Sequence, residues 1–192
     1  MGKNFYISDL HFGHKNCLAF DNRPFNSIAE MDEALIKNWN SVVSKDDTVY
    51  ILGDMFWYKI DKAIEILEQL NGRKKLIKGN HDRCHDAQFR KYFDKISDYE
   101  EVNDNGRHIV LCHYPIPCFK NHFYGWFHFY GHTHTGFEWN MMENVKKQMV
   151  DLYATTCEMY NVGCMLPWMG YTPRTFDEII EGYEAYHNVR RI

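Results

Sequence analysis

The 192-residue chain lacks the features that mark membrane, repeat and linker-rich proteins. No apolar run approaches the ~20 residues that a membrane-spanning helix needs, and the N-terminus lacks the apolar segment of a signal peptide. The chain also has no internal repeat and no stretch rich in proline, glycine or serine. We therefore expect a single domain over residues 1–192, located in the cytoplasm and without a membrane partner.

Cysteine spacing and charge exclude two further classes of protein. The six cysteines form no C-x-x-C pair, which argues against a zinc ribbon and favours free thiols in a reducing compartment. The formal net charge of −4 argues against a nonspecific nucleic-acid binder, which normally carries a basic face. Hydrophobic residues make up 45% of the chain and charged residues 25%, and this composition is typical of a globular protein with a sizeable core.

Hydrophobic periodicity predicts alternating strands and helices in the first half of the chain. Short apolar runs indicate buried strands, and apolar residues spaced by three and four positions indicate helices. A capping box formed by Ser27 and Glu30 predicts where the first helix begins. The expected strands are 5–8, 48–52 and 75–78, and the expected helices lie near 27–39, 60–70 and 87–93.

The second half of the chain is richer in strand signals. An antiparallel hairpin is expected around the Asn105-Gly106 turn, and a second capping box at Thr175 begins a last helix. Residues 140–151 are ambiguous, and a turn between short strands is one interpretation. The whole pattern predicts an α/β fold with α+β character in its second half, arranged as a layered sandwich covered by helices. The expected strands are 99–102, 108–112, 127–130 and 159–162.

Side chains that can bind a metal follow five of the expected strands. In α/β sheets, ligands bind outside the carboxyl ends of the strands, so these five strand ends predict one convergent site. Any one of these short motifs would indicate only a turn or a surface loop, but five in one order are specific. The candidate metal ligands are Asp9, His11, Asp54, Asn80, His113, His132 and His134.

The chemistry of this set indicates the kind of metal and substrate. Carboxylate, imidazole and amide donors without a thiolate suit Mn, Fe, Zn or Ni. Seven ligands are more than one ion needs, whereas two ions ~3.5–4 Å apart form a clamp for in-line displacement at phosphorus. Two divalent ions and two carboxylates leave the site positive, which favours an anionic substrate.

The ordered motifs resemble those of the calcineurin-like metallophosphoesterase superfamily. They stand as Asp9-Leu10-His11, Gly53-Asp54, Gly79-Asn80-His81-Asp82, His113 and Gly131-His132-Thr133-His134, and Asn161-Val162-Gly163 is similar to the closing strand end. The resemblance implies two β-sheets packed face to face as a sandwich flanked by helices, with a dinuclear metal site at the strand C-terminal ends.

The resemblance also implies roles for the site residues. One ion would be held by Asp9, His11 and His134, and the other by Asn80, His113 and His132, with Asp54 bridging the two. His81 and Asp54 would be the catalytic residues. His81 would protonate the leaving oxygen or stabilise the charge that develops on the phosphoryl group.

The function implied is metal-dependent hydrolysis of phosphate esters by a metal-bridging hydroxide that attacks phosphorus in line. We expect an open site, because 192 residues leave no room for a cap domain, and a small ester as substrate. A phosphodiester is expected in particular, because protein phosphatases of this family are usually longer. A non-catalytic metal-binding scaffold and a nuclease acting on polymeric nucleic acid are the alternatives, and the net charge disfavours the nuclease. Two Mn²⁺ ions are expected, with Fe, Zn or Ni as alternatives, and a homo-oligomer is left open.

One departure from the family pattern concerns His81. Many members extend the second motif to G-D-x-x-D, whose last Asp pairs with the histidine of the third motif, but this chain has Trp57 there. Asp82 could orient His81 instead, or cap the following helix. Three further candidates for binding substrate phosphate, weighed against ordinary loop roles, are His14, Arg23 and Arg83.

Overall fold

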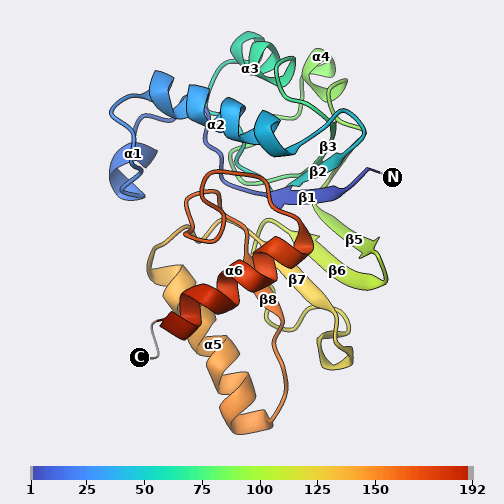
Figure 1. Ribbon diagram of the computed structural model, residues 1–192. Helices are drawn as coiled ribbons and strands as arrows, with labels where there is room; N and C mark the ends of the chain where they lie inside the picture. The colour runs from blue at the N-terminus through green and yellow to red at the C-terminus, as the bar shows by residue number, and fades with distance from the viewer. Residues whose placement is uncertain (1, 190–192) are drawn as a thin grey trace.

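Two four-stranded sheets form the centre of the structure, and helices cover their outer faces (Figure 1). The computed structural model describes residues 2–189. The first sheet has the order β1-β2-β3-β4, and its neighbouring strands pair in parallel. These strands are β1 (Asn4–Ile7), β2 (Thr48–Ile51), β3 (Arg73–Ile77) and β4 (Lys95–Ser97).

The helices of the first half connect the strands of this sheet and lie on its outer side, at the top of Figure 1. At the start of α2, the Ser27 side chain accepts a hydrogen bond from the Glu30 N–H, as the capping box predicts. Met31, Leu35 and Trp39 are buried along one face of this helix. The helices are α1 (Cys17–Phe20), α2 (Ile28–Val42), α3 (Ile60–Leu67) and α4 (Ala87–Arg90).

The second sheet is mixed and has the order β5-β6-β7-β8. The expected hairpin is confirmed as the antiparallel pair β5–β6, whereas β6–β7 and β7–β8 are parallel. The strands are β5 (Tyr99–Asp104), β6 (Arg107–Cys112), β7 (Phe127–Tyr130) and β8 (Met159–Asn161). The 3₁₀ turn η1 (His122–Tyr124) lies between β6 and β7, and α6 (Phe176–Val189) ends the described chain.

Helix α5 (Phe137–Tyr153) corrects the strand–turn–strand interpretation of residues 140–151. Parallel neighbours such as β7 and β8 need a long crossover connection, and α5 supplies it. The helical pattern of α5 is weak in the sequence because few apolar side chains of this helix are buried. The buried residues are Trp139 and Met142, and Lys146 points inward to the Met159 carbonyl oxygen. No helix in residues 2–189 is long and apolar enough to span a membrane.

Tyr6 of β1 joins the two sheets across their shared interface. Its ring is fully buried and packs edge-on against Phe129 of β7, with 4.9 Å between ring centroids. Its hydroxyl donates a hydrogen bond of 3.0 Å to the buried carboxylate of Asp104, at the end of β5. The face-to-face sandwich is therefore held by both an apolar and a polar contact at one side chain.

Replacing Tyr6 with Phe should keep the ring packing but remove the hydroxyl donor. Asp104 then loses one partner while it stays buried, so we expect the free energy of unfolding to fall by about 1–3 kcal/mol. Urea denaturation followed by circular dichroism measures this. Tyr124→Phe, at an exposed tyrosine, is the control and should change the stability by less than about 0.5 kcal/mol. Equal stability of Tyr6→Phe and wild type would contradict the role of this contact.

Candidate metal centre

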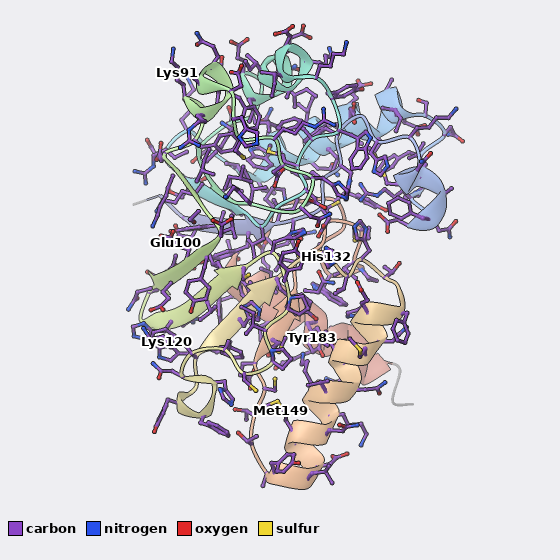
Figure 2. All side chains as sticks on the ribbon, turned by 180° about the vertical axis from the view of Figure 1, so that it is seen from behind. Lys91, Glu100, Lys120, His132, Met149 and Tyr183 are labelled. Carbon is purple, nitrogen blue, oxygen red and sulfur yellow. The ribbon has the colours of Figure 1, made fainter. Side chains whose placement is uncertain are left out.

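The seven predicted ligands follow five strands, at the edge where the two sheets meet. Figure 2 shows His132 between the upper and lower layers of the molecule. The ligands follow β1, β2 and β3 of the first sheet and β6 and β7 of the second. Because the carboxyl ends of all five strands lie in this region, residues far apart in sequence become neighbours.

A first group of ligand atoms comes from Asp9, His11 and His134. Their candidate donor atoms lie within 4.8 Å of one another. The His134 Nε2 atom is 3.7 Å from Asp9 Oδ1, and the two imidazole rings have centroids 5.1 Å apart. Asp9 is fully buried and His11 nearly so, and the His134 side chain is 17% exposed, so the group opens to solvent on the side of His134.

A second group lies beside the first and is formed around Asp54 and Asn80. The Asn80 Oδ1 atom is 3.0 Å from His113 Nε2 and 3.0 Å from His132 Nδ1. His113 Nε2 is also 3.7 Å from Asp54 Oδ2, while its Nδ1 lies 2.7 Å from the carbonyl oxygen of Leu52. That contact turns Nε2 toward the centre, as is usual for histidines that bind metals.

The 3.0 Å separations between Asn80 Oδ1 and two histidine nitrogens in the second group fit one divalent metal ion, whereas the 3.7 Å between His134 Nε2 and Asp9 Oδ1 in the first group is slightly longer. Two donor atoms that are each ~2.1 Å from one ion and separated by ~90–110° lie ~3.0–3.4 Å apart. The His11 Nε2 atom is buried and has no hydrogen-bond partner in the described chain, although it lies 3.9 Å from Asp54 Oδ2. Burial, with the nearby His134, lowers the pKa of His11 to about 2, which leaves the lone pair free to bind a cation.

The backbone at the candidate ligands is strained. Residues other than glycine rarely adopt positive φ, and such strain concentrates at functional sites. Five of the seven ligands have φ between 46° and 69°. They are Asp9, His11, Asp54, His132 and His134.

Two motif glycines make this crowded arrangement possible. Gly53 has a φ of 88°, a conformation that side chains rarely adopt. A Cβ on Gly79 would collide with the Asp54 carboxylate, so only glycine lets the β3 loop approach that side chain.

Arg23 does not face the substrate, which corrects its assignment as a phosphate-binding residue. Its side chain is buried and its guanidinium donates to the backbone oxygens of Asp9 and Leu10, at 2.8 and 2.9 Å. It also donates to the carboxylate of Asp21 at 2.9 Å. The strained ligand loop leaves these carbonyl groups without strand partners, and Arg23 satisfies them.

Asp21 is a functional residue that the sequence pattern did not reveal. Its Oδ1 atom lies 2.8 Å from Nδ1 of His134, and the residue is buried beside Arg23. Burial alone would lower the pKa of His134, but the hydrogen bond to Asp21 and the charge of Asp9 raise that pKa overall. Asp21 therefore orients a ligand that lies 113 residues further along the chain, and no local pattern signals that pairing.

His81 lies beside the centre and remains accessible. Its side chain is 41% exposed, its Nε2 is 4.0 Å from Asp54 Oδ2, and its backbone N–H donates to Asp54 Oδ1. Asp82 neither orients His81 nor caps a helix, since its carboxylate accepts the backbone N–H groups of Gly79, Asp54 and Met55. Helix α4 is capped by Asp86 instead.

Trp57 occupies the place where many family members carry an acidic partner for His81. Its ring contacts the His81 ring at 4.5 Å and stacks in parallel on His14 at 3.9 Å. Nδ1 of His14 is 3.1 Å from Nδ1 of His11, and burial, together with His81, lowers the pKa of His14. His14 is thus next to the candidate metal ligands. Arg83 is exposed directly after the third motif, and its contact with substrate stays a prediction.

Comparisons with known proteins agree with this architecture. The profile of the calcineurin-like phosphoesterases matches residues 5–153. An uncharacterized protein of Methanocaldococcus jannaschii is 41% identical over 136 residues, 70% of either chain. The gene 66 protein of Mycobacterium phage L5 is 36% identical over 134 residues, 60% of this chain and 64% of that one, so the chain spans just under two thirds of this phage relative. A solved structure from Aquifex aeolicus, of unknown function, superposes with a TM-score of 0.63 at 25% identity over 94% of this chain and 99% of that one.

Replacing Asp21 with Asn should weaken metal binding without unfolding the chain. The neutral amide cannot hold the His134 ring as the carboxylate does, and loss of such an outer partner typically costs 10–100-fold in metal affinity. Equilibrium dialysis against Mn²⁺ measures the change. Asp46→Asn, at an exposed carboxylate distant from the motifs, is the matched control and should bind like wild type. An unaltered Mn²⁺ affinity in a folded Asp21→Asn variant would refute the orienting role.

Proposed function

Because the chain belongs to the calcineurin-like phosphoesterase family, we propose that it hydrolyses phosphate esters, and phosphodiesters in particular, with two divalent ions. The observation that carries this proposal is the convergence of seven donor side chains from five strand ends into two adjoining groups, with the accessible His81 beside Asp54. Bound ions would lower the pKa of water and neutralise charge on the phosphoryl oxygens.

The proposed ligand roles follow the two groups of donor atoms. Asp9, His11 and His134 would hold one ion, and Asn80, His113 and His132 the other. Asp54 would bridge them, and its position supports this role, because Oδ2 lies 3.9 Å from His11 Nε2 and 3.7 Å from His113 Nε2. We propose Mn²⁺ for both positions. Fe, Zn and Ni prefer similar nitrogen and oxygen donors.

His81 is proposed to act on the substrate and not on the metal. Its imidazole is more exposed than those of His132 and His134, whose side chains are 30% and 17% exposed. From beside Asp54 it can donate a proton or a hydrogen bond to the oxygen that leaves phosphorus. No carboxylate that the structure describes is hydrogen-bonded to its ring, which instead packs against Trp57.

The proposed substrate is a small phosphate ester. The partial exposure of His81 and His132 supports an open centre, which can accept the two organic groups of a diester. Polymeric nucleic acid is the weaker alternative, because the net charge of −4 supplies no excess of basic residues to follow a phosphate backbone. One domain over residues 1–192 and a cytoplasmic location stay predictions, the latter in keeping with six free cysteines.

Metal dependence tests the proposal against a non-catalytic scaffold. The protein would be stripped with a chelator, reloaded with Mn²⁺, and assayed with bis(p-nitrophenyl) phosphate and p-nitrophenyl phosphate. We expect hydrolysis after reloading, with a higher kcat/KM for the diester. Protein that binds two ions but does not hydrolyse either ester would favour the scaffold, and a higher kcat/KM for the monoester would contradict the diester preference.

Removal of the proposed bridge should affect both metal positions. Asp54→Ala deletes a carboxylate that faces donors of both groups, so we expect the metal content to fall from two ions per chain to less than one. Elemental analysis of the reloaded, desalted variant measures this. Asp94→Ala, at an exposed carboxylate, is the control. Two retained ions in Asp54→Ala would rule out the bridging assignment.

Loss of the His81 imidazole should slow the reaction while both ions stay bound. In His81→Ala we expect kcat to fall by on the order of 10²–10⁴, the usual range for a positioned general acid. The fall in kcat should be larger for an alkyl ester than for a nitrophenyl ester, because a good leaving group needs less protonation. His85→Ala, an exposed histidine four positions along, serves as the control. Metal loss in His81→Ala would show instead that His81 is a ligand.

A further inference from the structure

Three aromatic side chains that border the candidate centre are exposed to solvent. Phe20, Trp57 and Tyr114 are 54%, 42% and 46% exposed. Single exposed aromatic residues are common on protein surfaces and need no explanation. Here, however, each ring contacts a histidine at or beside the centre.

Phe20 and Trp57 both contact the His14 ring, and we call this row of three rings the aromatic wall. Trp57 stacks on His14 with 3.9 Å between centroids and 6° between planes, and Phe20 is 5.6 Å from the same imidazole. The wall adjoins the first ligand group, since Phe20 is 5.4 Å from His134. Tyr114 lies apart from the wall, 4.7 Å from His132 of the second group.

The wall also adjoins the residue proposed to face the leaving oxygen. Trp57 contacts His81 at 4.5 Å between ring centroids. A phosphoryl group bound between the two ligand groups would therefore place one of its organic substituents beside Trp57 and Phe20. Aromatic side chains bind planar rings by stacking. Within the wall, the Trp57 indole offers the largest exposed ring, with one face covered by His14 and the residue 42% exposed.

We infer that the aromatic wall is the subsite for the organic part of the substrate, and that the substrate is a nucleotide, in which a phosphoryl group and a planar base are joined. The inference rests on the proposed function, since it assumes that the phosphoryl group binds at the metal centre. The acidic net charge favours a small nucleotide over a nucleic-acid strand. Stacking of one base on aromatic side chains contributes roughly 5- to 150-fold in affinity.

The test compares two ligands that differ only by the base. Adenosine 5′-monophosphate and ribose 5-phosphate would be titrated into Mn²⁺-loaded protein by calorimetry, and phosphate release would be followed in parallel. We expect wild type to bind the nucleotide at least fivefold more tightly than the sugar phosphate. Trp57→Ala and Phe20→Ala should reduce this ratio toward one, and Trp57→Phe should keep most of it. The affinity for ribose 5-phosphate should change little in these variants.

Tyr114→Ala is the matched control, because Tyr114 is as exposed as the wall residues and borders the other ligand group. It should keep the preference for the nucleotide. Equal affinities of wild type for the two ligands, no binding of either, or a preference lost in Tyr114→Ala but kept in Trp57→Ala would each overturn the inference. If the ratio behaves as expected but no ester is hydrolysed, only the proposed function fails.

A change of kcat in Trp57→Ala with an unchanged binding ratio would also overturn the inference. That outcome would show that Trp57 acts only through His81, whose ring it contacts. Binding constants separate the two roles, because a residue that only positions His81 has no effect on how tightly a base is held.

Discussion

The carboxylate of Asp54 is the feature around which the rest of the structure is arranged. Its Oδ2 atom lies within 4.0 Å of nitrogens from His11, His81 and His113, which belong to three different strand ends. Such a concentration of donors is unfavourable in a buried place unless a cation compensates it. The buried Nε2 of His11, which has no hydrogen-bond partner within residues 2–189, indicates the same requirement. The two sheets must therefore meet closely enough to bring these side chains together.

Several polar residues hold this arrangement in place without facing a substrate. Asp82 accepts three backbone N–H groups and fixes the loop that carries Asp54. Arg23 does the same for the carbonyl groups of the Asp9 loop, and it also pairs with Asp21 behind His134. These contacts compensate for the positive φ angles of the ligands, because strained backbone persists only where its surroundings over-determine it.

The replacement of an acidic partner by Trp57 changes the character of the site next to His81. A carboxylate would hold the imidazole by charge and by a hydrogen bond, whereas the indole holds it by ring contact and makes no hydrogen bond to its nitrogens. The same indole presents apolar surface to solvent. One substitution thus affects both the environment of the proposed acid and the kind of organic group that can lie beside it.

The order of strands and helices over much of the chain, and the identity of the metal-capable residues, can be predicted from the sequence alone. These depend on local periodicity, on capping, and on the rule that polar residues after parallel strands share one edge. The roles of Arg23, Asp21 and Asp82 become visible in the folded protein, because each is defined by partners that approach through folding. The folded structure also shows that residues 140–151 form part of α5, a helix whose inward Lys146 obscures the apolar pattern. Local patterns record which face of an element is buried, but they do not record which element lies against it.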